Sequence, residues 1–222
     1  MINIFNKEAP SVSCEAVLHS MGCRKSDPSY PEYVRAFEEI EDDAIGCLNL
    51  EARYTYGKLP PEFPKSHKLY GKQLIFFLIT AGHKITEYAD EHFANGRYMK
   101  GMIANAIADS CLFSYENEVL CAIKEECKKQ NKGIRSMLDA PDGIPPEFNT
   151  LILSRLNARE DLGVEVNKAY VFTPLKTYAC IMELSENTEE MNIFHDCTRC
   201  AKRDECTYRS KVYNDRDHLY SR

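Results

Sequence analysis

The feature that most constrains the fold is an apolar run at residues 74–79, Leu-Ile-Phe-Phe-Leu-Ile. It is the longest apolar run in the sequence, and it is far shorter than the roughly 20 residues that span a bilayer. It is also too short for an independent helix. We therefore predict a buried β-strand over residues 74–80 that ends at Ala81 and Gly82, in a protein without a transmembrane helix.

Apolar residues recur at three- and four-residue steps around this strand, which indicates amphipathic helices. The longest stripe runs from about Tyr98 to Gln130, as one helix or as two that meet near Ser114. Residues 56–70 hold three prolines and predict an irregular crossing. Strands and helices do not alternate regularly, so the sequence favours the α+β class over a doubly wound sheet. The other expected elements are an edge strand or arm in residues 1–12, helices at 13–21, from Pro31 to about Leu48, at 84–94 and at 148–156, and strands at 170–172 and 178–184.

The composition excludes several classes of protein. With 28 Lys and Arg against 34 Asp and Glu, the net charge is −6, unlike that of a general nucleic-acid binder or of a protein that works on anionic membranes. The first eight residues lack the basic and apolar regions of a signal peptide. We therefore expect a soluble cytoplasmic protein with no nucleic-acid or membrane partner. In that reducing compartment its ten cysteines are thiols, metal ligands or redox centres, not a disulfide framework.

The most specific chemical motif is a cysteine cluster near the C-terminus, formed by Cys197, Cys200 and Cys206 with His195 close by. Three thiolates within ten residues repel one another unless a cation shares their charge, so the spacing favours a metal site. Zinc would take His195 as its fourth ligand, whereas an iron–sulfur cluster would take its fourth ligand from elsewhere. The alternatives are free thiols in a flexible tail or a redox pair of Cys197 and Cys200. Candidates for the fourth ligand of a cluster are Cys14, Cys23 and Cys180.

Several segments, taken in order, resemble the reactivation domain of cobalamin-dependent methionine synthase and its free-standing relatives. They are residues 15–23, the Leu-Ile-Thr-Ala-Gly step at 78–82, the helical stretch 104–110, the Gly-Ile-Arg step at 133–135, and the strand entry at 173–180. The resemblance implies a single C-shaped α+β domain around a twisted, mainly antiparallel sheet flanked by helices. We assign residues 1–190 to this domain and residues 191–222 to a Cys-rich metal or iron–sulfur tail.

The resemblance also implies a chemistry. In this family, inactive cob(II)alamin on a corrinoid protein or corrinoid methyltransferase is reduced by one electron and remethylated from S-adenosylmethionine. An iron–sulfur cluster in the tail would be useful as an electron source, which favours it over zinc. The expected cofactors are therefore an iron–sulfur cluster or zinc, S-adenosylmethionine, and cobalamin on the partner.

Four residues in or beside the segments that resemble the family are candidates for ligand contacts. The resemblance implies that Arg135 holds a carboxylate, that Asp139 contacts an amine or hydroxyl, and that Lys176 and Tyr178 face a corrin or nucleoside. The sequence departs from the family after Arg135, where Ser-Met-Leu replaces the family's Pro-Gly-Tyr step. This departure supports a second hypothesis, in which the chain is a noncatalytic zinc- or iron–sulfur-binding interaction module that kept the fold and lost the ligand pocket.

Overall fold

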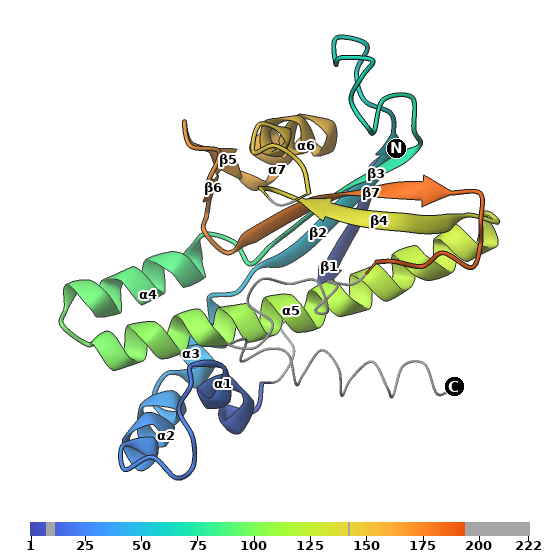
Figure 1. Ribbon diagram of the computed structural model, residues 1–222. Coiled ribbons are helices and arrows are strands. Elements are labelled where there is room, and N and C mark those ends of the chain that lie inside the picture. Colours follow the sequence, from blue (N-terminus) through green and yellow to red (C-terminus); the bar gives the residue numbers. More distant parts are fainter. Residues whose placement is uncertain (8–11, 142, 194–222) are drawn as a thin grey trace.

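The computed structural model describes residues 1–7, 12–141 and 143–193, and they fold around one antiparallel sheet (Figure 1). The sheet has five strands in the order β1-β2-β3-β7-β4, and a separate two-stranded ribbon pairs β5 with β6. The strands are β1 (Asn3–Lys7), β2 (Leu50–Gly57), β3 (Leu74–Thr80), β4 (Gly133–Asp139), β5 (Glu165–Val166), β6 (Phe172–Thr173) and β7 (Thr177–Ser185).

Helices cover both faces of the sheet. The long helix α5 packs on one face, which we call the inner face, and α6 and α7 cover the other, the outer face. None of the described helices combines the length and the apolar character that crossing a bilayer requires. The helices are α1 (Cys14–Ser20), α2 (Tyr30–Glu38), α3 (Glu41–Gly46), α4 (Lys84–Ala94), α5 (Tyr98–Lys129), α6 (Phe148–Leu156) and α7 (Ala158–Leu162).

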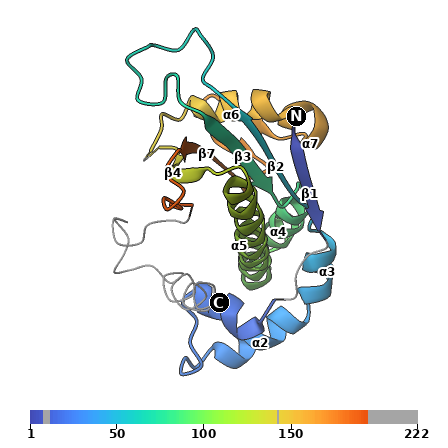
Figure 2. The ribbon, with the colours of Figure 1, turned by 90° about the vertical axis from the view of Figure 1, so that its right-hand side faces the viewer.

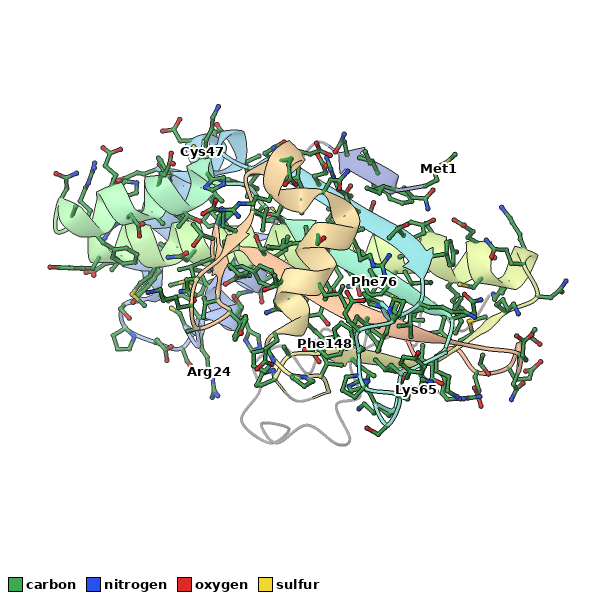
Figure 3. All side chains as sticks on the ribbon, turned by 90° about the horizontal axis from the view of Figure 1, so that it is seen from above. Met1, Arg24, Cys47, Lys65, Phe76 and Phe148 are labelled. Carbon is green, nitrogen blue, oxygen red and sulfur yellow. The ribbon has the colours of Figure 1, made fainter. Side chains whose placement is uncertain are left out.

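The predicted strand at residues 74–80 is confirmed as β3, the centre of the sheet, and all seven of its residues are buried. Its side chains alternate between two hydrophobic cores because successive residues of a strand point to opposite faces. Phe77 joins the core under α5, and Phe76 joins the core under α6. In Figure 3, Phe148 lies at the start of α6 and Phe76 lies on the sheet beside this helix. Because both faces of β3 pack against a hydrophobic core, every residue of the run must be apolar, which explains why the run is unbroken.

The elements follow an arc. Figure 2 shows the sheet with α6 and α7 at one end, α5 and α4 in the middle, and α1 to α3 at the other end. The α+β class and the C-shaped arrangement expected from the resemblance are therefore confirmed. The described residues do not include 194–222, so the assignment of the tail stays a prediction.

Other expectations are confirmed or corrected by the described elements. The helix expected at residues 13–21 is confirmed as α1, and the Ser13 hydroxyl caps it by accepting a hydrogen bond from the Ala16 amide at 3.4 Å. The long stripe forms one helix, α5, without a break at Ser114. The helix expected from Pro31 to Leu48 is wrong in one respect, because the chain leaves helical geometry at Ile40, which has a φ of −126°. Strands β2 and β4 were not among the expected elements, because charged residues within them hide the strand pattern.

Candidate functional site

The candidate site lies on the inner face, where β4 and β7 meet α5. Asp139 at the end of β4 is paired with Cys180 of β7, and paired residues share a face of the sheet. Tyr178, two residues before Cys180, points to the same face and packs against the core under α5. Glu116 of α5 is near enough to act electrostatically on both Tyr178 and Cys180. Three elements distant in sequence therefore bring two carboxyls, a phenol and a thiol together.

An ion pair fixes the entry of β7 to α5. The Lys176 ammonium lies 2.8 Å from the Asp109 carboxylate, and these side chains are only 16% and 35% exposed. The carbonyl of Lys176 accepts hydrogen bonds from the amide of Ala81 at 2.8 Å and from the hydroxyl of Thr80 at 3.3 Å. Asp109 and Glu116 are seven residues apart, about two helical turns, and so lie on the same side of α5. Polar groups thus line the inner face from Lys176 to Asp139.

A hollow of about 230 Å³ opens beside this row, where β4 and β7 meet β6. Leu175 and Val171 on its rim are 66% and 46% exposed, which leaves apolar surface at the mouth. The lining of the hollow therefore combines polar side chains with exposed apolar ones, as ligand sites commonly do. Its lining consists of Asp139, Ala140, Asn149, Tyr170, Val171, Phe172, Leu175, Thr177, Tyr178 and Ala179.

Burial changes the ionisation of the groups on the inner face. Burial, with a smaller contribution from the neighbouring Asp139 carboxylate, raises the pKa of Glu116 to about 7. Burial likewise raises the pKa of the Tyr178 hydroxyl and of the Cys180 thiol well above their usual ranges, with contributions from the same two carboxyls. With a pKa of about 7, the Glu116 carboxyl is partly protonated near neutral pH.

Arg135 lies apart from the other three predicted ligand residues. It occupies an irregularity of β4 between Ile134 and Ser136, and its guanidinium contacts Glu183 at 3.0 Å and Glu190 at 3.3 Å. Glu183 alternates with the inner-face residues of β7 and so belongs to the outer face. Asp139 is four residues further along β4, roughly 13 Å at the usual strand rise. The structure thus places Asp139 and Tyr178 beside the same hollow, Lys176 further along the chain at the entry of β7 in an ion pair with Asp109, and Arg135 elsewhere.

The predicted metal ligands Cys197, Cys200, Cys206 and His195 lie outside the described residues. Within the described ranges, no group of three or more His, Cys, Asp or Glu residues is arranged to hold a metal ion. Burial raises the pKa values of Cys14 and Cys23, and Cys180 is fully buried, so these thiols favour the protonated form. The metal site stays a prediction about the tail.

Two acids of the site, Asp109 and Glu116, were absent from the residues predicted from sequence. The sequence could have indicated them, because both acids lie beside the apolar stripe of α5 and are seven residues apart. That spacing alone gives them a common side of the helix. It does not reveal that this side faces the end of β7, which depends on how the sheet packs on α5.

Comparison with known proteins supports the fold. No protein-family model and no curated protein matches the sequence. Among solved structures, the chain is similar to the crystal structure of the MetH reactivation domain bound to AdoHcy, with a TM-score of 0.56 and 11% sequence identity. The match covers 98% of this chain and 86% of that chain. The resemblance inferred from sequence is therefore confirmed at the level of the fold, and this chain has the fold of the MetH reactivation domain.

Proposed function

We propose that this protein is an accessory protein of corrinoid-dependent methyl transfer. It would support the reductive reactivation of cobalamin carried by a partner, either a corrinoid protein or a corrinoid methyltransferase. The observation that carries this proposal is the likeness over nearly the whole chain to a reactivation domain whose structure contains AdoHcy. Likeness of fold alone does not fix function, so the residues of the inner face need their own argument.

The inner face has groups suited to the amino-acid end of an S-adenosylmethionine-type ligand. Asp139 can accept hydrogen bonds from an ammonium, whereas the Lys176 ammonium is already paired with Asp109 and would have to share its donors with a ligand carboxylate. Leu175 and Val171 offer apolar surface to a flat nucleoside. Bound S-adenosylmethionine would supply the methyl group, while these residues hold and orient it. The hollow of about 230 Å³ is smaller than the roughly 300–1,000 Å³ of typical ligand sites, so it would enclose only part of the ligand.

The tail would supply the redox part of this function. Cys197, Cys200 and Cys206 would hold an iron–sulfur cluster with a fourth ligand, which the proposal prefers to zinc bound with His195. The preference rests on chemistry, because reduction of cobalamin needs an electron and zinc has no redox chemistry.

Calorimetric titration of the purified protein with S-adenosylmethionine and with AdoHcy tests the ligand site. We expect Asp139→Asn to weaken binding by about tenfold, since a charge-assisted hydrogen bond contributes roughly 1.5–3 kcal/mol. Asp90→Asn, an exposed change on α4, is the matched control and should leave the affinity unchanged. Absence of binding at millimolar ligand would remove the methyl-donor role.

A specific observation favours the second function, a noncatalytic metal-binding interaction module. The Arg135 guanidinium is already held by two glutamates and by the Ser185 hydroxyl at 3.3 Å, so it has few donors left for a ligand carboxylate. Anaerobic purification with metal analysis distinguishes the two functions. Broad absorption near about 400 nm, lost in Cys197→Ser, supports the reactivation role. A colourless protein with stoichiometric zinc and no nucleoside binding supports the interaction module.

A further inference from the structure

The connection between β2 and β3 is a long segment without a helix or strand of its own. It consists of residues 58–73, which we call the basic loop. Figure 2 shows this loop projecting beyond the end of the sheet. Ordered loops of more than about 12–15 residues without secondary structure are uncommon in compact domains and usually have a function. The basic loop shares no residue with the lining of the hollow, so it is a candidate interaction surface of its own.

The charge of the basic loop is opposite to that of the rest of the chain. The loop has four lysines and one glutamate, a net charge of +3, which leaves −9 for all other residues (−6 − 3). Within the described part of the chain, Lys72 is the only one of the four lysines in an ion pair, with Glu183 at 3.4 Å. The other three ammonium groups have no carboxylate partner there, although acids outnumber bases in the sequence. All four lysines are exposed, namely Lys58, Lys65, Lys68 and Lys72.

Packing holds the basic loop against the outer face of the sheet. Leu59 and Leu69 are buried in the core under α6. The ring of Phe63 lies edge-on to Phe148, the first residue of α6, with 5.2 Å between ring centroids. Three prolines further restrict the backbone, because the proline ring fixes φ. A loop held in this way loses little conformational freedom when it binds a partner, which favours binding.

Apolar surface lies among the lysines of the basic loop. Pro61 and Pro64 are exposed and stand between Lys58 and Lys65 in the sequence, and Tyr70 is half-buried. In Figure 3, Lys65 lies at the periphery of the molecule, where a partner could approach it. Protein–protein interfaces commonly combine apolar contacts with charged groups around them. The loop therefore offers both kinds of contact to the surface of another protein.

The distribution of charge across the molecule favours a compact partner. Segment 38–43, in α2 and α3, has five acids in six residues and lies at the opposite end of the arc from the basic loop (Figure 2). DNA or an anionic membrane would extend over the acidic remainder of the chain and be repelled by it. An acidic patch on a protein can contact the loop alone. Attraction at one end of the arc and repulsion at the other would also orient such a partner as it approaches.

We infer that the basic loop docks an acidic surface patch of a partner protein. The ammonium groups of Lys58, Lys65 and Lys68 pair with carboxylates of the partner, and the exposed prolines between them contact its apolar side chains. The inference does not rest on the proposed function, because it requires neither a ligand in the hollow nor a metal.

Binding of an acidic probe to the full-length protein tests this inference. The probe is a fluorescein-labelled peptide of alternating glutamate and serine, and fluorescence anisotropy should show binding that weakens as the ionic strength rises. The double change Lys58→Gln and Lys65→Gln should weaken binding about tenfold, which corresponds to about 1.4 kcal/mol. The control pair Lys84→Gln and Lys129→Gln, exposed on α4 and α5, changes the net charge equally. It should alter the affinity by no more than about twofold, because charges far from the loop are screened.

Two further measurements identify the contact and the class of partner. Carbodiimide coupling joins a lysine to a carboxylate that it contacts, so mass spectrometry should find the probe attached to lysines of the basic loop and not to Lys84 or Lys129. Duplex DNA and vesicles that contain phosphatidylserine should bind more weakly than the peptide at the same ionic strength. Absence of peptide binding, an equal loss in the control pair, coupling away from the loop, or tighter binding of DNA or vesicles would overturn the inference.

Discussion

At the scale of single residues, His92 shows what burial does to an ionisable side chain. It is 5% exposed in α4, and within the described residues neither ring nitrogen has a hydrogen-bond partner. Its ring lies edge-on to Tyr88, with 4.7 Å between centroids. Burial lowers the pKa of His92, and the nearby cations Arg97 and Lys100 lower it further. The fold therefore requires the neutral imidazole.

This arrangement predicts a contribution to acid sensitivity. Since the pKa of His92 is lower in the folded than in the unfolded chain, the unfolded chain binds the proton first as the pH falls. Its contribution to stability is complete above the unfolded pKa of about 6.5 and decreases as the pH falls below that value. We expect His92→Phe to be more stable by about 1 kcal/mol at pH 7, because it removes a buried unsatisfied group.

The variant should also lose less stability than the original protein between pH 7.5 and pH 5. Thermal unfolding followed by circular dichroism across this range is the measurement. His19→Phe, a change at an exposed position of α1, serves as the control. A variant with an unchanged pH profile would show that His92 finds a partner in solution.

At the scale of elements, a buried arginine joins the outer helices to the sheet. Arg53 of β2 is 5% exposed, and its guanidinium pairs with Glu51 on the same strand and with Asp161 of α7. It also donates to the carbonyl of Leu156 at the end of α6, at 3.3 Å. One guanidinium therefore bonds to acceptors on β2, α6 and α7. Removing it would leave the Glu51 carboxylate, whose side chain is only 13% exposed, without its cationic partner.

We expect Arg53→Ala to lower the free energy of unfolding by about 3 kcal/mol, as is usual when one partner of a buried ion pair is removed. Arg159→Ala breaks a comparable contact with Glu165 at 2.9 Å, but both side chains are mostly exposed, and the loss should be within about 0.5 kcal/mol. Urea denaturation of both variants compares these losses. Equal losses would mean that the Arg53 network adds no more than a surface pair.

At the scale of the whole molecule, the sheet separates two cores that share one central strand. Adjacent residues Phe76 and Phe77 are both fully buried, one in the core under α6 and the other in the core under α5. Because β3 serves both cores, loss of packing on either face weakens the same strand. The two layers should therefore unfold together.

This coupling predicts similar behaviour for Phe76→Ala and Phe77→Ala. Each should lower the free energy of unfolding by about 3–5 kcal/mol, the usual cost of deleting a buried aromatic ring. Leu175→Ala, at an exposed position, should change it by no more than about 0.5 kcal/mol. Far-ultraviolet circular dichroism and tyrosine fluorescence should report one coincident transition. Two separate transitions in Phe76→Ala would show that α6 and α7 form an independent unit.

The sequence by itself determined the elements whose signals are local. Residues 74–79 are apolar throughout and predict a buried strand, and the stripe of α5 and the helix that begins after Ser13 depend on neighbours within a few positions. The family resemblance gave the correct fold. It also named Asp139, Lys176 and Tyr178 as site residues, and of these Asp139 and Tyr178 line one hollow, which leaves their role as ligand contacts a prediction.

Only the tertiary structure decided which side chains share a face. The irregularity after Ile134 and the pairing with β7 direct Arg135 toward Glu183, while Asp139 on the same strand faces α5. Strand β2 could not be predicted from its own residues because it contains Arg53, a charged residue that is buried in the structure. The acid that allows this burial, Asp161, is 108 residues away in the sequence. A one-residue change of register reverses the face of every later side chain. Register is set by strands distant in the sequence, so no local pattern could contain it.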